Sequence, residues 1–216
     1  MAREVEFKLL VDGPGELEAL ARAAEARGAR TGASVLQQNH FIDTADGALR
    51  AGGGLVRLRE EAGRWTLAAK GPGEQQGELH RRTELEIEVA PGVAARLLAG
   101  ELDPLAELER GLGPSEFLAE LARARGRQRL VPVGTLANER ARVGPLACGA
   151  SALWLELDRT RLPGGTTHYE IELEVPEGSE PAAQELLAEL CAAAGVRGRP
   201  APSKAARFFE ALARKP

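Results

Sequence analysis

Charged and apolar residues alternate at the start of the chain, where Glu4, Glu6 and Lys8 are separated by Val5 and Phe7. Because successive side chains of a β-strand point to opposite faces, a strand here would have one charged face and one apolar face. The same alternation returns at Arg57 and Arg59, at Thr66 and Lys70, at Arg82, Glu84, Glu86 and Glu88, at Arg140 and Arg142, at Glu156 and Asp158, and at Glu170, Glu172 and Glu174. The pattern predicts a protein built mainly from antiparallel strands.

Helical spacing of apolar residues interrupts these strands in a few places. It predicts one helix from about residue 17 to Gly28, a largely helical stretch over 91–125 with Ser115 as a cap, and two helices near 181–194 and 203–214. Further strands are expected near 35–43, 55–60, 64–70, 79–89, 133–143, 153–162 and 168–175, with hairpin turns at 61–63 and 163–165. We expect one domain over 1–216, with a helical insertion at about 91–130.

About eight strands with one charged face favour a closed antiparallel barrel, because closure removes unpaired strand edges and creates an interior. If the apolar face lined that interior, the Leu- and Ala-rich helices would have no apolar sheet surface to cover. The expected fold is therefore α+β and mainly antiparallel β, an eight-stranded closed tunnel barrel with a charged interior and helices packed outside.

Carboxylates of like sign on one strand face repel each other unless a positive charge lies nearby. A divalent cation would relieve that repulsion. Arg57 and Arg59 repel each other in the same way, and a polyanion would relieve their repulsion. A metal-chelated polyphosphate would therefore neutralise both groups of charges. A solvated sheet face would also place charge at every second position, but such faces usually mix signs, whereas most of these strands are dominated by one sign. From the repulsion we expect that Glu6→Gln or Glu172→Gln leaves the metal-free protein equally stable or more stable.

Composition narrows the function further. The net charge of -4 argues against nucleic-acid binding through overall charge. The charged N-terminal residues do not fit a signal peptide, no apolar run has the length of a membrane span, and Cys148 and Cys191 lack metal-ligand or redox spacing. We therefore expect a cytoplasmic protein.

Taken together, these segments resemble the CYTH family, also called triphosphate tunnel metalloenzymes, whose hallmark is a first strand of the form E-x-E-x-K. The resemblance rests on E-V-E-F-K at 4–8, N-H-F-I-D-T at 39–44, L-V-R-L-R at 55–59, W-T-L-A-A-K-G-P at 65–72, E-L-E-I-E at 84–88, E-L-D at 156–158, Y-E-I-E-L at 169–173 and S-K-A-A-R at 203–207. It implies an eight-stranded tunnel that binds triphosphates with Mg²⁺ or Mn²⁺.

By motif position, the resemblance also implies roles for individual residues. The triphosphate-binding set is Lys8, Arg57, Arg59, Lys70, Arg82, Arg140, Arg142 and Lys204. The metal-binding set is Glu4, Glu6, Asp158, Glu170 and Glu172. The catalytic set is Lys8, Glu84, Glu86 and Arg142, with Glu156 as a further supporting acid.

Within the family, the pattern is most similar to bacterial inorganic triphosphatases, which implies hydrolysis of the terminal phosphoanhydride of inorganic triphosphate. Class IV adenylate cyclase, thiamine triphosphatase and a non-catalytic polyphosphate- or nucleotide-binding module are the alternatives. Trp154 has the strand parity of Glu156 and Asp158, so it could stack on an organic group, although a rim tryptophan packed under a helix is the simpler interpretation. The expected partner is a small triphosphate, without nucleic acid or membrane, and a homodimer is left open.

Overall fold

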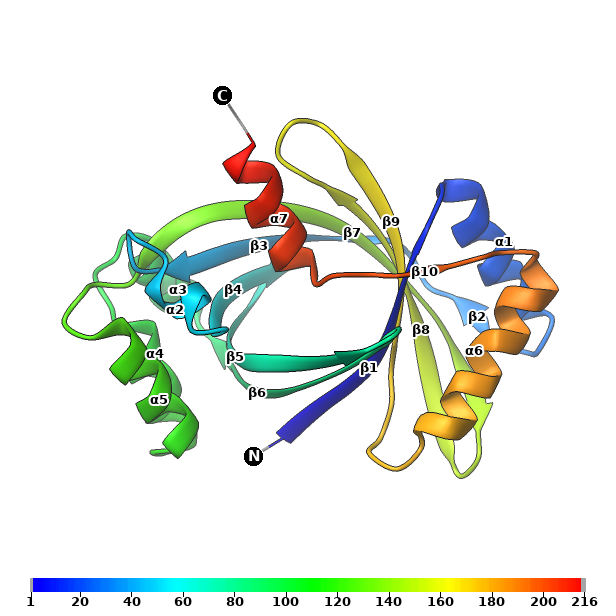
Figure 1. Cartoon of the computed structure of the whole chain (residues 1–216), viewed down its shortest axis with the longest axis horizontal. Coiled ribbons are helices and arrows are strands. Elements are labelled where there is room, and N and C mark those ends of the chain that lie inside the picture. Colours follow the sequence, from blue (N-terminus) through cyan, green and yellow to red (C-terminus); the bar gives the residue numbers. More distant parts are fainter. Residues whose placement is uncertain (1, 215–216) are drawn as a thin grey trace. The chain divides into compact units, whose positions relative to one another are not determined.

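The computed structural model describes residues 2–214, which form a mixed structure dominated by one sheet. The strands follow the hydrogen-bonded order β10-β1-β6-β5-β4-β3-β7-β8-β9, with β2 paired to β7 (Figure 1). Because β9 also pairs with β1, the sheet closes on itself. The eight long strands therefore form a closed antiparallel barrel, as the charge alternation predicted.

The long strands are β1 (Ala2–Val11), β3 (Val35–Asp43), β4 (Leu55–Glu61), β5 (Arg64–Gln76), β6 (Leu79–Val89), β7 (Val131–Cys148), β8 (Ser151–Arg161) and β9 (Thr167–Glu174). Two strands of two residues, β2 (Arg30–Thr31) and β10 (Arg199–Pro200), were not predicted. Such short pieces have no period of two from which a sequence pattern could identify them.

The helices are α1 (Pro14–Glu25), α2 (Ala48–Ala51), α3 (Pro91–Leu98), α4 (Pro104–Leu112), α5 (Glu116–Arg125), α6 (Glu180–Ala194) and α7 (Lys204–Ala213). Ser115 caps α5 as expected, since its hydroxyl accepts a hydrogen bond from the Leu118 amide at 3.2 Å. The four-residue α2 was not predicted, because it is too short for a helical period. No helix within 2–214 is long and apolar enough to cross a membrane.

The chain divides into two compact units, each with its own apolar core. Unit 1 comprises Gln37–Gly73, Arg82–Leu136 and the start of β1, and unit 2 comprises Glu4–Leu36, Glu74–Arg81 and the chain from Ala137 onward. In unit 1, buried Val56, Leu58 and Leu67 of the sheet pack with residues of α3, α4 and α5, among them Leu97 and Leu108.

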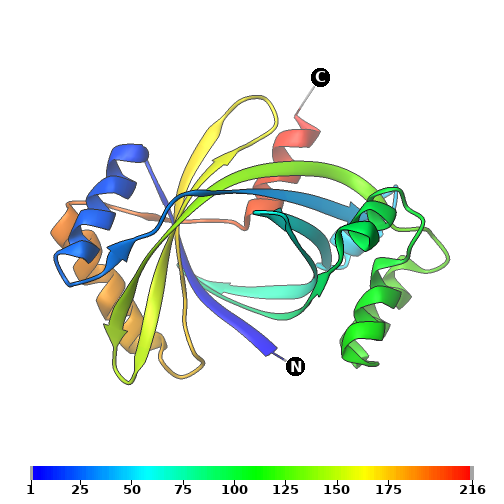
Figure 2. The same cartoon turned by 180° about the vertical axis from the view of Figure 1, so that it is seen from behind.

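Unit 2 is organised in the same way around the other strands. Val5 and Phe7 of β1 and Leu155 of β8 pack in one core with Leu20 of α1 and Leu187 of α6. The two helices lie side by side, in blue and orange in Figures 1 and 2. In both units the helices therefore cover the sheet face formed by the apolar residues of the strands. The charged residues, at the alternate positions, lie on the other face of the sheet.

A two-residue turn explains the β4–β5 hairpin at the predicted position. Ala62 and Gly63 both have positive φ, at 51° and 80°, and Glu61 is paired with Arg64. This backbone twist matches the right-handed twist of the flanking strands, which fixes the register of β4 against β5. Register matters because a slip of one residue would exchange the apolar and charged faces.

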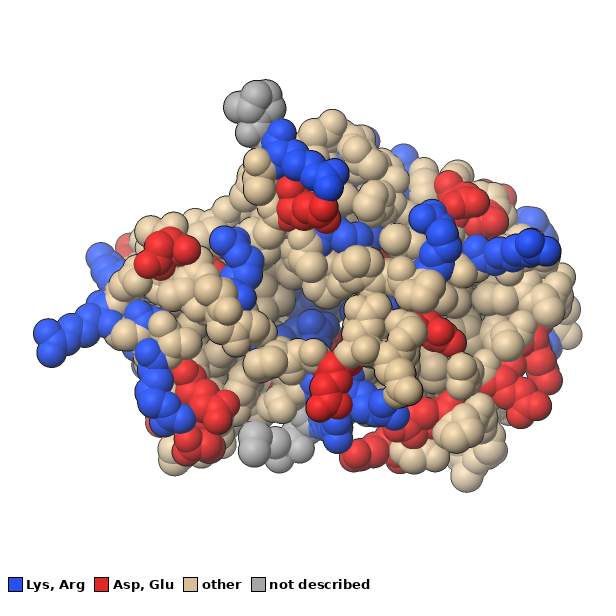
Figure 3. Space-filling view, viewed as in Figure 1, with Lys and Arg blue, Asp and Glu red and all other residues tan. Residues whose placement is uncertain are grey.

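Charges on the exposed surface differ from those of the sheet face. In the space-filling view, lysines and arginines are interspersed with aspartates and glutamates (Figure 3). Several of them form exposed pairs, such as Arg27 with Glu189 at 2.7 Å and Arg64 with Glu88 at 2.8 Å. Exposed pairs of this kind contribute little, typically about 0–1 kcal/mol each.

Candidate functional site

The strand register of unit 2 places the charged residues of four strands in two rows. Arg140 of β7 lies opposite Asp158 of β8, which lies opposite Glu170 of β9. In the neighbouring row, Arg142 lies opposite Glu156, Glu156 opposite Glu172, and Glu172 opposite Lys8 of β1. Six of the residues that the sequence assigned to metal or triphosphate therefore lie on one face of one sheet: Lys8, Arg140, Arg142, Asp158, Glu170 and Glu172.

Arg140 is the central cation of these rows. Its guanidinium donates to both carboxylate oxygens of Asp158, with Nε to Oδ1 at 2.8 Å, and it also pairs with Glu156 and Glu172. A planar guanidinium can bind several carboxylate oxygens at once, which a lysine ammonium cannot do with the same geometry. The surrounding carboxylates raise the pKa of Arg140 against the opposing effect of its burial.

Lys8 extends the cluster to the first strand. Its ammonium lies 2.8 Å from Glu6 and 2.8 Å from Glu172. All three side chains are nearly inaccessible to solvent. The E-x-E-x-K strand thus supplies a buried cation between two carboxylates.

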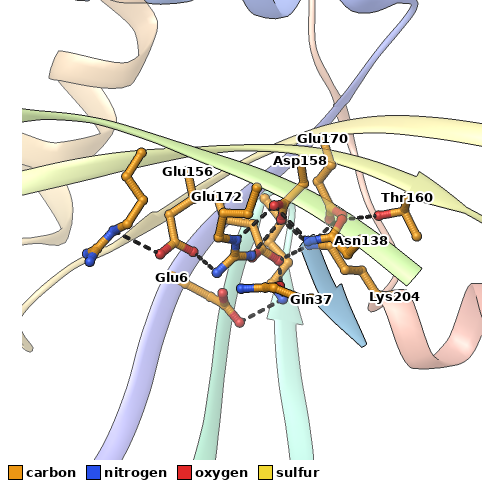
Figure 4. A network of polar contacts seen from close by, with 12 residues as sticks. Glu6, Gln37, Asn138, Glu156, Asp158, Thr160, Glu170, Glu172 and Lys204 are labelled. Atoms are coloured by element: carbon orange, nitrogen blue, oxygen red, sulfur yellow. Dashed lines mark hydrogen bonds and ion pairs between the residues drawn. The ribbon is translucent and has the colours of Figure 1, made fainter. Parts of the chain in front are cut away.

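Lys204, which comes from a terminal helix and not from a strand, is part of the same cluster. It is the first residue of α7, and its Nζ lies 2.7 Å from Asp158, 2.9 Å from Glu170 and 2.8 Å from Glu172 (Figure 4). Ser203 caps the helix by accepting from the Ala206 amide at 3.2 Å, which fixes the start of α7 next to Lys204.

Sequence reasoning missed Arg207, although it ends the quoted S-K-A-A-R motif. It is 5% exposed, donates to the Pro202 carbonyl at 3.1 Å, lies 3.0 Å from His168 Nδ1 and pairs with Oε2 of Glu170. A spacing of three residues puts Arg207 on the same helical face as Lys204, and that spacing was the available signal.

Asn138 and Thr160 support Asp158 through hydrogen bonds that the sequence did not suggest. The Asn138 amide donates to Asp158 Oδ1 at 2.9 Å, and the Thr160 hydroxyl donates to the Asn138 carbonyl oxygen at 2.7 Å (Figure 4). All three are buried. The chain of hydrogen bonds holds the Asp158 carboxylate in one orientation.

These contacts determine the charge states of the cluster. Burial by itself would raise the pKa of Asp158, but the charges of Lys204 and Arg140 outweigh it and lower that pKa. Burial would also raise the pKa of Glu172, but the charges of Lys204, Lys8 and Arg140 hold it well below its usual range. At Lys204, the three carboxylates outweigh burial and raise the pKa. Asp158 and Glu172 are therefore anionic and Lys204 is cationic at neutral pH.

Three carboxylates of this cluster could hold a metal ion. Asp158, Glu170 and Glu172 each offer an oxygen within 4.8 Å of the others, and all three residues are buried. Oε1 of Glu170 is buried without a hydrogen-bond partner among the described residues, whereas its Oε2 is paired with Arg207. An unsatisfied carboxylate oxygen suits an additional cation, and an all-oxygen donor set suits Mg²⁺ or Mn²⁺.

The expectation that these acids repel each other in the metal-free protein is wrong. Each of Glu6, Asp158, Glu170 and Glu172 touches at least one buried cation of the chain itself. Neutralising a carboxylate would leave such a cation unpaired, which is strongly destabilising in a buried site. Glu6→Gln and Glu172→Gln should therefore destabilise the metal-free protein.

Unit 1 contains a separate group of the predicted residues. Glu84 of β6 lies 2.7 Å from Lys70 of β5 and 3.7 Å from Arg57 of β4, and Arg59 donates to Asn39 of β3 at 3.2 Å. Lys70 is buried, at 4% exposure. On these strands, Glu84 compensates part of the charge of Lys70 and Arg57.

The remaining predicted residues, on β1, β6 and β7, have more solvent contact. Glu4 of β1 and Arg82 of β6 are half-buried, and Glu86 of β6 is exposed. Arg142 has 58% of its side chain exposed and lies 3.4 Å from Glu156. Burial raises the pKa of that glutamate, and the neighbouring charge of Arg140 reduces the effect.

Trp154 stands at an exposed position of β8. The Arg142 guanidinium lies 5.4 Å from the centre of its ring, a cation–π distance, and 40% of the residue is exposed. Its ring also packs on Gly144 of β7, where an added Cβ would come within 2.6 Å of a ring atom. The tryptophan thus packs on backbone and on an arginine, which differs from the predicted packing under a helix.

The Asp-Thr pair of the N-H-F-I-D-T segment has a structural explanation. Asp43 accepts hydrogen bonds from the amides of Thr44, Leu49 and Arg50, and the Thr44 hydroxyl accepts from the Ala48 amide at 2.7 Å. Both side chains are buried. They hold the turn and the short helix α2 that precede β4, the strand that carries Arg57 and Arg59.

Comparison with known proteins agrees with this arrangement. The CYTH domain model matches residues 2–209. A structure of HpAC1 from Hippeastrum, described as a putative adenylyl cyclase with a dominant triphosphatase activity, is 25% identical, with a TM-score of 0.76 over 96% of this chain and 95% of that one.

Two further structures share the fold at lower identity. A putative adenylate cyclase from Bacillus halodurans is 24% identical, with a TM-score of 0.65 over 97% of this chain and all of that one. One from Vibrio parahaemolyticus is 16% identical, with a TM-score of 0.58 over 97% of both chains. No curated protein matches the chain. With the family model matching nearly its whole length and the barrel closed as described, the chain belongs to the CYTH domain family.

Proposed function

We propose that this protein hydrolyses the terminal phosphoanhydride of inorganic triphosphate with the help of Mg²⁺ or Mn²⁺. The observation that carries the proposal is the buried group of Asp158, Glu170 and Glu172, in which Oε1 of Glu170 lacks a hydrogen-bond partner within residues 2–214. A protein that only binds anions has no need of carboxylates beside its ligand. Glu4 and Glu6 complete the proposed metal-binding set.

Lysines and arginines on the charged strand faces supply the chemistry for a polyphosphate. Arginines grip phosphate oxygens in pairs and lysines act as point charges. We assign phosphate binding to Lys8, Arg57, Arg59, Lys70, Arg82, Arg140, Arg142 and Lys204. Several of these are held in place by carboxylates, such as Lys70 by Glu84 at 2.7 Å, so they are oriented before a substrate arrives.

Hydrolysis of a phosphoanhydride depends mainly on positioning and on charge neutralisation. A bound divalent cation supplies charge neutralisation at the phosphate oxygens. The chain's own contribution is the fixed placement of Lys8 and Arg142, for which we propose roles at the reacting phosphate. Glu84 and Glu86 are the proposed supporting acids of the catalytic set, in unit 1.

The relative from Hippeastrum favours hydrolysis over cyclisation. That protein, described as a putative adenylyl cyclase, has a dominant triphosphatase activity, and it is 25% identical to this chain over nearly its whole length. We therefore place class IV adenylate cyclase second. Thiamine triphosphatase and a polyphosphate- or nucleotide-binding module rank below it.

Exposed Trp154 is the specific observation that favours an organic substrate. Its ring already stacks with Arg142, and a nucleobase or thiazole could add to that stack. The chain has few further aromatic residues, at 4% of its length in all. Inorganic triphosphate needs no such platform, which is why we place it first.

A substrate panel tests the proposal. Phosphate release from tripolyphosphate, ATP and thiamine triphosphate is measured with Mg²⁺, with Mn²⁺ and with EDTA, and cyclic AMP is assayed in parallel. We expect kcat/KM for tripolyphosphate to exceed the other values at least tenfold, about 1.4 kcal/mol of transition-state stabilisation. Cyclic AMP as the main product would establish the cyclase, and a thiamine triphosphate preference lost in Trp154→Ala would establish the stacking role.

A further inference from the structure

The Lys204 ammonium lies where three carboxylates converge. Its Nζ is 2.7 Å from Asp158, 2.9 Å from Glu170 and 2.8 Å from Glu172. These are the same three residues whose oxygens are close enough to one another to hold a metal ion. Figure 4 shows the lysine entering the group from α7 while the acids project from β8 and β9.

A divalent cation bound by all three carboxylates would need the space between their oxygens. The ammonium fills that space, and its positive charge would repel a second cation at contact distance. We propose that Lys204 is a displaceable counter-ion of the metal site: the ammonium neutralises the acids in the metal-free protein, moves out when the metal enters, and then binds a phosphate oxygen of the substrate. This inference rests on the proposed metal site.

The side chain can leave without movement of its helix. Lys204 is the first residue of α7 and 15% of its side chain is exposed, so rotation about its four-carbon stem can carry the ammonium out of the cluster. The helix itself is held by the Ser203 cap and by buried Phe208. Displacement therefore requires a change of rotamer and no unfolding.

The acids keep their positions once the lysine has left, because other cations hold them. Arg207 binds Glu170, Arg140 binds Asp158 and Glu172, and Lys8 binds Glu172 at 2.8 Å. In the part of the chain that the structure describes, Oε1 of Glu170 is left without a hydrogen-bond partner. Lys204 is thus the cation whose removal opens the group without dismantling it.

Competition between lysine and metal has two consequences. Metal binding is weakened in the absence of substrate, because the ammonium must first give up three carboxylate contacts. A triphosphate then strengthens metal binding, since it provides anionic oxygens for the released ammonium. By thermodynamic linkage, the metal strengthens triphosphate binding by the same factor.

Mn²⁺ titration followed by the electron paramagnetic resonance signal of the free ion measures the first consequence. We expect Lys204→Met to bind Mn²⁺ at least tenfold more tightly than the natural chain in the absence of triphosphate. Lys204→Arg keeps the charge and should bind no more tightly than the natural chain. Arg214→Met is the matched control, since it removes one positive charge from the end of the same helix, where Arg214 pairs with Glu210 at 2.5 Å, and should leave the affinity unchanged.

The unmodified chain provides a second measurement that does not depend on the stability of a variant. The sequence contains four lysines, so ¹⁵N-lysine spectra can resolve the Lys204 ammonium. Titration with Mg²⁺ should move this resonance away from its carboxylate-bound position. A Lys204 resonance that stays fixed while Mg²⁺ binds would overturn the inference.

The outcomes separate this inference from the proposed function. Equal or weaker Mn²⁺ binding by Lys204→Met, with clear binding by the natural chain, contradicts displacement and leaves the metal site intact. Binding by neither chain at millimolar Mn²⁺ contradicts the metal site itself. Tight binding by Lys204→Met, with loss of the strengthening effect of tripolyphosphate, supports both steps of the proposal.

Discussion

Glu170 combines two different environments in one carboxylate. Oε2 is shared by Arg207 and Lys204, whereas Oε1 is buried and has no hydrogen-bond partner from any described residue. An unsatisfied buried oxygen is costly unless a ligand satisfies it. The residue therefore serves the fold through one oxygen and is available to a cation through the other.

Glu170→Gln separates these two contributions. We expect Mn²⁺-dependent release of phosphate from tripolyphosphate to fall at least a hundredfold, because the amide is a poor metal ligand. The free energy of unfolding should fall by about 3 kcal/mol, since Arg207 and Lys204 lose their anionic partner. Urea denaturation and phosphate release measure the two effects.

Glu107→Gln is the matched control for that variant. Glu107 is a buried carboxylate of unit 1 that pairs with Arg110 at 2.5 Å and lies outside the candidate site. Its neutralisation should affect stability without reducing Mn²⁺-dependent release of phosphate. An equal loss of phosphate release in both variants would contradict the role given to Glu170.

The environment of His40 should make the stability of unit 1 depend on pH. Burial lowers its pKa below the ordinary value of 6.5, with the charge of Glu60 acting in the opposite sense. Its Nδ1 lies 2.9 Å from the Thr135 hydroxyl, and its ring stacks on Trp65 with centroids 5.8 Å apart. A lowered pKa means that the unfolded chain takes up a proton first, so His40 stabilises the fold above pH 6.5 and loses this effect as the pH falls.

Thermal unfolding at pH 7.5, 6.5 and 5.5 tests this expectation. The Tm of the natural chain should fall more steeply with decreasing pH than the Tm of His40→Gln. His168 also has a lowered pKa, caused by burial and by Arg207, and it contributes equally to both chains. Parallel curves for the two proteins would show that His40 has no such role.

At the scale of elements, α7 delivers two cations to one site. Lys204 and Arg207 are three residues apart and therefore lie on one helical face, from which both reach Glu170. Ser203 fixes where the helix begins. The position of the cap thus determines where both side chains enter the cluster.

Removal of that cap should affect both the stability of the fold and its affinity for metal. Ser203→Ala should lower the free energy of unfolding by about 1 kcal/mol and should also alter Mn²⁺ affinity, because the first turn of α7 carries Lys204. Ser115→Ala removes the equivalent cap of α5, with the same 3.2 Å bond, in unit 1. A similar loss of stability without a change in metal affinity is expected there, and a metal effect of equal size in both variants would contradict the role given to Ser203.

The strands of the site were predictable because their alternation is local. The alternation of charged and apolar residues was enough to predict that Lys8, Arg140, Asp158 and Glu172 lie on one face of the sheet. The strand register of the structure places them opposite one another on that face. Contacts between distant elements carry no such local signal. Arg207 meets Glu170 across 37 residues of sequence, and only the packing of α7 brings them together.

The same limit explains why the expected repulsion among the acids was wrong. Whether Glu172 is destabilised depends on which cations reach it, and its partners Lys8, Arg140 and Lys204 come from three separate elements. Composition and parity reveal that such charges exist. They do not reveal their pairing in space.

At the scale of the whole molecule, each unit combines an apolar core with a charged strand face. The core of unit 1 surrounds Leu58 and Leu108, and the core of unit 2 surrounds Phe7 and Leu187. Helices cover the apolar faces, so substitutions on the charged faces can change function without opening a core. This division explains how one fold can carry an unusually charged sheet.

Ligand binding should stabilise the whole molecule. Tripolyphosphate at a hundred times its dissociation constant should add about 2.7 kcal/mol by mass action, which corresponds to about 5 to 10 °C in Tm for a chain of this length. The shift should shrink at high salt, because the binding groups are cations. Differential scanning calorimetry with sulfate as the control anion measures it, and equal shifts with both anions would indicate general salt stabilisation.

The central claim is that Asp158, Glu170 and Glu172 hold the divalent cation. Anomalous diffraction from crystals soaked in Mn²⁺ and a non-hydrolysable triphosphate tests it most directly. We predict one strong peak among these three carboxylates, with the Lys204 ammonium withdrawn from them. A peak bound elsewhere, with Lys204 still in contact with all three acids, would contradict it.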